Sequence, residues 1–430
     1  MSLYLGKKIK EWQIRFRIWW ENTGFSSSKF LKIGGIVAGI LGLGLVFYGI
    51  YSWWWWNSSR RVIPAEIAKE RESMPTPDPE AEKTYPSPIN GVFYTHAEQD
   101  VFSSRRPLAI MVNNHPQARP QFGLSKADLV YEVVAEGGIT RFLAVFHSQD
   151  VEKVGPVRSA RTYYLDWAAE LYAWFAHWGG SYMDADDKAN QYNPNYSFTC
   201  HSDADSYAKI NRINLPSLDQ MWLGSSAYWR DNSRGVPQEH TGFTSTTKLW
   251  NVAPTKYPGW EGLKKFDPWK FKDADTHTGG TPAQAPSPQE ETERPSSVES
   301  ITFNFWENPQ FLVNWEHDSE ENAYRRYQGG EPTIDAGAGD FQIQAKNVVL
   351  QFVKETLFND QKKHLRYQTV GEGSAYIFLD GKVIKGTWEK DDIYGRTRFY
   401  DSAGKEVKFN RGQIWIEIVP ARNKDLVKLQ

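Results

Sequence analysis

An uncharged run of 24 residues, at positions 33–56, constrains this chain more than any other feature. A helix of that length is roughly 36 Å long, which is enough to cross the hydrocarbon core of a bilayer. Only a helix pairs all of its own backbone groups in that medium. Trp53 to Trp56 close the run, and aromatic rings favour the membrane interface. The sequence therefore predicts one N-terminal transmembrane helix. The run is too long for a cleaved signal peptide and offers no small-residue cleavage site.

The charges that flank this run predict its orientation. Residues 1–32 carry seven Lys and Arg against two Glu, whereas basic and acidic residues are mixed after the run. Because positive flanks stay in the cytoplasm, we expect a single-pass protein of the cell membrane with a cytoplasmic N-terminus and an extracytoplasmic C-terminus. Apolar residues at helical spacing within residues 1–32 favour a basic amphipathic segment on the inner leaflet. A solvated basic tail that serves only topology is the alternative.

Composition divides the remainder of the chain. Residues 57–90 are rich in proline and alternating charges, which predicts an extended tether. Residues 273–298 are polar and low in apolar side chains, which predicts a disordered linker between two extracytoplasmic domains. We expect an α/β domain at 91–272 and a β-rich domain at 299–430. The predicted fold class is α+β: one transmembrane helix, an α/β layered domain with a mixed sheet, and an antiparallel β-rich domain.

Local patterns support this division. In the first domain, compact apolar runs at 107–113, 140–147 and 174–178 predict strands, and residues 159–173 predict a helix. In the second domain, short β patterns recur at 301–305, 311–315, 347–353, 375–379, 383–388, 397–400 and 413–419. Asp380-Gly381 lies between two of these patterns and has the preferred residues for a tight hairpin.

Four arginines near predicted strand and helix ends suggest an anion site. Ser159 is a plausible N-cap for the predicted helix, and Arg158 and Arg161 flank it. Helix N-termini attract anions, and guanidinium groups bind phosphate or carboxylate through paired hydrogen bonds. Arg119 and Arg141 join this site if their strands end at the same edge. The alternative is structural: these arginines pair with Asp128, Glu132 and Glu136 and hold loops together.

A catalytic function would also need a group that transfers protons. The candidates are Asp128, Glu136, His177 and His240, of which His177 is followed by glycines at the end of a predicted strand. A histidine at a strand end is more often structural. The single cysteine, Cys200, and the scattered histidines predict no metal site, and the absence of nucleotide-binding motifs predicts no cofactor.

Several motifs that follow one another in order carry a resemblance to a known family. The chain resembles the YerB-like family of bacterial lipoproteins in its segments at 106–115, 118–121, 127–132, 136–141, 155–161, 177–181, 345–348, 386–388 and 412–415. The resemblance covers roughly residues 100–430 without the 273–298 segment. It implies a two-part extracytoplasmic module of the bacterial cell envelope with no settled activity. The chain departs from the lipoprotein pattern because it has no N-terminal lipobox cysteine, so a transmembrane helix would replace the lipid.

These observations lead to two functional hypotheses. The first is a non-catalytic envelope protein that binds peptidoglycan, another anionic wall polymer or a wall-synthesis protein through Arg119, Arg141, Arg158, Ser159 and Arg161. The second is an envelope phosphoryl or glycosyl transferase or hydrolase, in which Asp128, Glu136 or His177 moves protons. The formal net charge of −2 gives no indication of nucleic-acid binding.

Overall fold

A computed structural model describes residues 80–182, 204–260, 267–273, 296–358 and 364–430, with scattered residues before position 80. Most of the predicted transmembrane helix at 33–56, of the cytoplasmic segment at 1–32 and of the 273–298 linker lies outside these residues. Within the described part of the chain, no helix is long and apolar enough to span a membrane.

The largest element is a mixed sheet that draws strands from both halves of the chain. Among the described residues it has eleven strands. In spatial order they are β10 (Ser296–Ser297), β22 (Lys382–Lys390), β21 (Gly371–Leu379), β18 (Asn347–Val353), β24 (Ile414–Pro420), β4 (Leu129–Glu136), β5 (Ile139–Phe146), β3 (Leu108–Asn113), β6 (Trp174–His177) and β7 (Ser217–Asp219), with β23 (Arg398–Tyr400) beside β22. The sheet is therefore continuous across the predicted boundary between the two domains.

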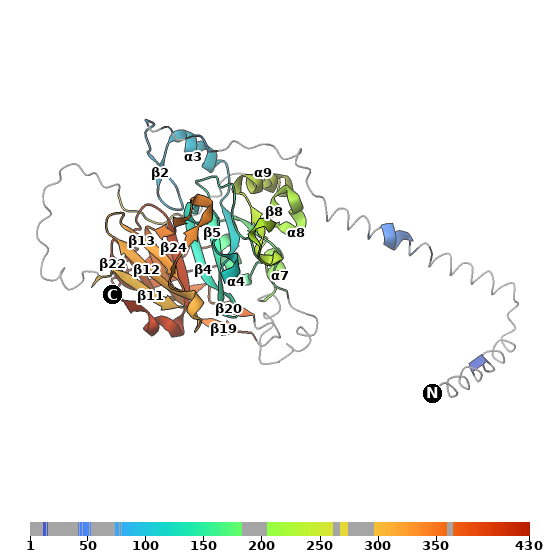
Figure 1. The fold of residues 1–430 in the computed structure, drawn as a ribbon. Coiled ribbons are helices and arrows are strands. Elements are labelled where there is room, and N and C mark those ends of the chain that lie inside the picture. The colour runs from blue at the N-terminus through green and yellow to red at the C-terminus, as the bar shows by residue number, and fades with distance from the viewer. Residues whose placement is uncertain are drawn as a thin grey trace, which may run out of the picture. The chain divides into compact units, whose positions relative to one another are not determined.

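The central strand β24 joins the strands from the two halves of the chain into one sheet. β24 pairs in parallel with β18 on one side and with β4 on the other (Figure 1). All residues of β18 and β24 are buried, as expected for central strands that are covered on both faces. The strands predicted at 107–113, 140–147 and 347–353 are confirmed as β3, β5 and β18. The Asp380-Gly381 hairpin is also confirmed, because both residues have positive φ and join β21 to β22.

A second, antiparallel sheet is built from the C-terminal half. Its strands are β14 (Glu331–Pro332), β13 (Ala323–Gln328), β12 (Leu312–Asp318), β11 (Ser300–Asn304) and β25 (Lys428–Leu429), with β17 (Gln344–Ala345) beside β13. It packs on the large sheet through buried aromatic side chains. The ring centroids of Trp315 and Trp415 are 5.4 Å apart. The mixed sheet and the antiparallel β-rich part agree with the predicted fold class.

Short helices and hairpins complete the described structure. The helices are α3 (His96–Ser103), α4 (Thr162–Ala169), α7 (Ser206–Arg212), α8 (Gln220–Leu223) and α9 (Thr246–Lys256). The two-stranded pairs are β1 (Tyr85–Pro86) with β2 (Phe93–Tyr94), β8 (Tyr228–Arg230) with β9 (Gly242–Thr244), β15 (Ile334–Asp335) with β16 (Phe341–Gln342), and β19 (Glu355–Leu357) with β20 (Leu365–Tyr367). The end of the predicted tether is thus folded, since β1 lies within it and Ile89 is fully buried.

A buried ion cluster joins α4 to the C-terminal strands. Glu170, just after α4, accepts from Lys390 Nζ at 2.5 Å and from Thr397 Oγ1 at 2.7 Å, and it also pairs with Arg396. Burial raises the pKa of Glu170, but the charges of Lys390 and Arg396 outweigh burial and lower it to about 2. The ionised carboxylate therefore stabilises contact between the two halves of the chain.

Replacing Glu170 by glutamine should lower the free energy of unfolding at neutral pH by about 3 kcal/mol, because two cations lose their buried partner. The folded pKa lies below the usual value of 4.5, so the contribution of Glu170 is present above that pH and is lost as the pH falls toward about 2. Urea denaturation across this range should show the difference between wild type and Glu170→Gln shrinking. A difference that is independent of pH would contradict this assignment.

Candidate functional site

Two histidines meet beyond the end of β3. His115 follows that strand, and His240 ends a short 3₁₀ helix, Gln238–His240. Their rings are stacked with centroids 4.6 Å apart. The Asn113 amide donates to His240 Nδ1 at 2.8 Å, and the Gln117 backbone N–H donates to His115 Nδ1 at 3.2 Å. Each neutral ring therefore holds its proton on Nε2, and the pair offers two N–H donors.

The surroundings of these rings favour their neutral form. Burial lowers the pKa of His240 to about 4, with further contributions from His115 and Arg158. Burial also lowers the pKa of His115, and the charges of Arg158 and Arg119 add to this effect. Glu239, which is exposed, is the carboxylate that opposes the shift for both histidines.

Arg158 is a partly buried cation beside this pair. Among the described residues its side chain has no hydrogen-bond partner, and its Nε is buried without an acceptor. Burial and the charge of Arg141 lower the pKa of Arg158 to about 10, although the charge of Glu239 partly opposes this shift. We call His115, Arg158 and His240 the histidine–arginine cluster. It combines a guanidinium that has no hydrogen-bond acceptor among the described residues with two neutral N–H donors, an arrangement suited to an anion.

The other arginines predicted near Arg158 are occupied. Arg161 pairs with Glu136, and Arg141 NH2 lies 3.8 Å from the same carboxylate. Arg141 NH1 also donates to the Ser159 carbonyl at 2.8 Å. This part of the predicted site therefore has the structural arrangement that we considered as the alternative: two arginines share one carboxylate at the end of β4.

Ser159 does not cap a helix, so this prediction was wrong. α4 begins at Thr162, its N-cap residue is Arg161, and no side chain caps it. The Ser159 hydroxyl donates instead to the Trp178 carbonyl at 3.0 Å. Bridges from Val157 to Val112 and from Ala160 to Gly180 explain the difference, because they keep this segment extended along the sheet.

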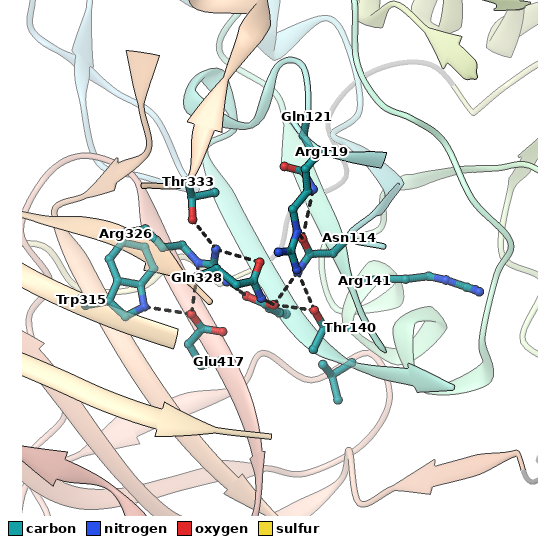
Figure 2. Close-up of polar contacts among 12 residues, drawn as sticks. Asn114, Arg119, Gln121, Thr140, Arg141, Trp315, Arg326, Gln328, Thr333 and Glu417 are labelled. Atoms are coloured by element: carbon teal, nitrogen blue, oxygen red, sulfur yellow. Dashed lines mark hydrogen bonds and ion pairs between the residues drawn. The ribbon is translucent and has the colours of Figure 1, made fainter. Parts of the chain in front are cut away.

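Arg119 is held by contacts other than those of Arg141 and Arg161. Its Nε donates to Asn114 Oδ1, and both of its terminal nitrogens donate to the Gln310 carbonyl, each at 3.2 Å. Figure 2 shows Arg119 beside the network around Arg326, whereas Arg141 points away from it. The four predicted arginines therefore do not converge, although His115 lies near both Arg119 and Arg158.

Asp128 and His177 are buried and fully engaged. Asp128 accepts from Asn90 Nδ2 at 2.5 Å, from the His147 backbone N–H at 2.7 Å and from Ser148. The His177 ring contacts the Gly179 carbonyl and the Ser217 hydroxyl, each at 2.7 Å. Burial raises the pKa of Asp128 and lowers that of His177. These contacts hold loops in place, and they occupy the side-chain atoms that could exchange a proton with a substrate.

A buried network of hydrogen bonds and ion pairs lies next to Arg119. Of its members Glu132, Arg326 and Glu417, only Glu132 was identified from the sequence. Arg326 NH2 donates to Glu132 Oε2 at 2.6 Å, and its NH1 donates to Thr333 Oγ1 at 2.7 Å (Figure 2). The Trp315 indole donates to Glu417 Oε1 at 2.9 Å. Burial, together with the charge of Glu132, raises the pKa of Glu417 well above its usual value. Two carboxyl groups thus accompany a single buried guanidinium.

A groove of about 700 Å³ opens above this network. Arg119, Gln121, Gln328 and Thr333 line it, together with Pro116, Pro120, Gln310, Gly329, Glu331, Pro332, Ile334 and Asp340. Gln328 and Thr333 also hydrogen-bond to the buried Glu132 and Arg326. Among the described residues, no group of three His, Cys, Asp or Glu side chains is placed to hold a metal ion.

Two family models match the chain, one in its N-terminal half and one in its C-terminal half. The family described as "Protein of unknown function (DUF3048) N-terminal domain" matches residues 95–261, and its C-terminal domain matches residues 301–416. The chain belongs to the DUF3048 family. It is 31% identical over 342 residues to "Putative lipoprotein YerB" of Bacillus subtilis (strain 168), covering 80% of this chain and 88% of the relative. The predicted YerB-like resemblance is confirmed.

A solved structure of a similar protein supports the assignment of this chain to the DUF3048 family. The crystal structure of the YerB protein from Bacillus subtilis aligns with a TM-score of 0.63 and 27% sequence identity. It covers 81% of this chain and 100% of that chain. The relative thus shares both the N-terminal and the C-terminal parts of the fold.

Proposed function

We propose that this DUF3048 protein is an extracytoplasmic cell-envelope protein, anchored in the membrane by residues 33–56, that binds an anionic wall polymer through its histidine–arginine cluster. The uncharged run with basic residues before it supports the anchor and its orientation. A relative described as a lipoprotein supports an envelope location. Protease added to intact cells should remove the folded part, and full protection would contradict this orientation.

Arg158 is the observation that carries the binding proposal. A partly buried guanidinium without an acceptor loses hydration and gains little in return. Its lowered pKa reflects burial and repulsion by Arg141. An anion bound to Arg158 would supply the hydrogen-bond acceptor that the guanidinium lacks and would offset its positive charge. The free protein therefore has a site that favours an anionic ligand.

The two neighbouring histidines add directional hydrogen-bond donors beside the charge of Arg158. Nε2 of His115 and Nε2 of His240 are hydrogen-bond donors, since both Nδ1 atoms already accept hydrogen bonds from the chain. A phosphate group has several acceptor oxygens and can meet a guanidinium and N–H donors together. A phosphate-bearing polymer therefore fits the cluster better than a neutral glycan does.

Binding of poly(glycerol phosphate) to the full chain in detergent tests this proposal, with dextran as the neutral control. We expect the phosphate polymer to bind and dextran not to bind. Affinity should fall as salt is added, because the cluster is partly exposed and ions screen it. Equal binding of the two polymers, or binding of neither, would overturn the proposal.

A further inference from the structure

A further arginine, Arg230, ends strand β8 (Figure 1). Its guanidinium lies over the ring of Trp178, with Cζ 4.2 Å from the ring centroid. Its NH1 donates to the Gln238 carbonyl and, at 3.4 Å, to the Thr241 hydroxyl. Among the described residues none of these contacts is with a carboxylate, so Arg230 is a partly exposed cation without an ion pair there.

Backbone hydrogen bonds place Arg230 close to Arg158. The Trp178 N–H donates to the Arg158 carbonyl at 3.0 Å. The preceding residue, Val157, donates its N–H to the Gly242 carbonyl at 2.7 Å, and Gly242 is the partner of Arg230 in the pairing of β8 with β9. Since neighbouring strands lie about 4.8 Å apart, the backbones of Arg158 and Arg230 are separated by roughly 10 Å.

The ring of Trp178 is held in position, and this positions the guanidinium that stacks on it. Gly242 packs against the ring, where a Cβ atom would lie 2.6 Å from two ring carbons, so a larger residue would push the ring aside. Tyr228 meets the same ring edge to face, with centroids 5.9 Å apart. Arg230 is therefore arranged before a ligand binds, which lowers the entropy cost of binding.

The charges around the two arginines favour a ligand with more than one negative charge. Asp231 follows Arg230 directly, but it pairs with Lys153 Nζ at 2.6 Å. Glu239, which is exposed, is the carboxylate that acts on Arg158. Burial lowers the pKa of Arg230, and no carboxylate of the described residues raises it. The two arginines therefore carry more charge than the carboxylate beside them.

We propose that the anionic polymer binds through two of its phosphate groups, one at the histidine–arginine cluster and the next at Arg230. This inference rests on the proposed function and adds to it a requirement for a repeating ligand. Among the described residues only NH1 of Arg230 donates to the chain, so NH2 and Nε remain for a phosphate. Because the second phosphate is tethered to the first, it binds at a high effective concentration.

Calorimetric titration of the full chain in detergent, with glycerol 3-phosphate and with a glycerol phosphate oligomer of two repeats, tests this arrangement. The oligomer should bind at least about tenfold more tightly than the single phosphate, because its second contact is intramolecular. Equal affinities would overturn the two-phosphate arrangement. This comparison uses the wild type, so it does not depend on whether any variant folds.

Variants of Arg230 locate the second contact. Arg230→Gln should weaken binding of the oligomer by about tenfold and leave binding of glycerol 3-phosphate unchanged. Arg230→Lys keeps the charge and should lose less affinity than Arg230→Gln. Arg325→Gln, which removes an exposed arginine charge elsewhere, should change neither affinity. An unchanged oligomer affinity in Arg230→Gln, or an equal loss for both ligands, would overturn the inference.

Arg158→Gln separates this inference from the proposed function on which it rests. We expect it to weaken binding of both ligands. If it does so while Arg230→Gln has no effect, the histidine–arginine cluster binds phosphate and the second contact is refuted. If Arg158→Gln changes neither affinity, the proposed function itself is refuted.

Discussion

Replacing Arg326 by leucine is expected to lower the free energy of unfolding by about 3–5 kcal/mol, because it leaves a buried carboxylate without its partner. Arg326, Glu132 and Glu417 are each fully buried. Arg326 makes its short ion pair with Glu132, at 2.6 Å, whereas its Nε lies 3.8 Å from Glu417, whose pKa is raised by burial and by the charge of Glu132. Removal of the guanidinium would therefore strand Glu132 between the two sheets.

Denaturant unfolding followed by tryptophan fluorescence measures this loss, since Trp315 and Trp415 lie beside the network. Arg325→Leu is the matched control. It removes a neighbouring arginine whose side chain is 47% exposed, and we expect a change of about 0.5 kcal/mol or less. Adding Glu132→Gln to Arg326→Leu should recover part of the loss by removing the stranded charge. If Arg326→Leu were no more destabilising than Arg325→Leu, this account of the network would be wrong.

Replacing Arg158 by glutamine is expected to weaken binding of poly(glycerol phosphate) by about 10- to 100-fold, the range for losing one or two charge-assisted hydrogen bonds. Stability should not fall, because the Arg158 side chain has no partner among the described residues and is desolvated in the fold. Isothermal titration of the full chain measures the affinity, and denaturant unfolding measures the stability.

Arg325→Gln is the control for this substitution because it removes the same charge at an exposed position on β13. Its affinity for the polymer should match that of the wild type. An equal loss in both variants would mean that the polymer responds to overall charge rather than to the histidine–arginine cluster. A large loss of stability in Arg158→Gln would mean that Arg158 has a structural role.

Much of the fold could be predicted because its strands have local signatures. The mostly apolar run at 347–353 and the Asp380-Gly381 turn each determine structure through residues that are close in sequence. The position of β24 could not be predicted in this way. It lies in parallel between β18 and β4, so its neighbours are distant in sequence, and its pattern gives no register.

The candidate site was harder to predict, because charge pairing depends on three-dimensional register. The sequence placed Arg158 and Arg161 together, but Arg161 pairs with Glu136, whereas the charge of Arg158 acts on His115 and His240. Arg326 lies 194 positions from its partner Glu132, and no local pattern links them. His115 did carry a signal, since it directly follows the polar residues that end a predicted strand.

The pKa of His240 offers the most direct test of the central claim, that an anion binds at the histidine–arginine cluster. Burial and the nearby cation lower this pKa to about 4 in the free protein. An anion bound beside the ring stabilises its charged form, so saturating poly(glycerol phosphate) should raise the pKa toward the usual value of 6.5. NMR titration of the His240 ring protons, identified with His240→Gln, measures it. A pKa that stays the same with polymer bound would contradict the claim.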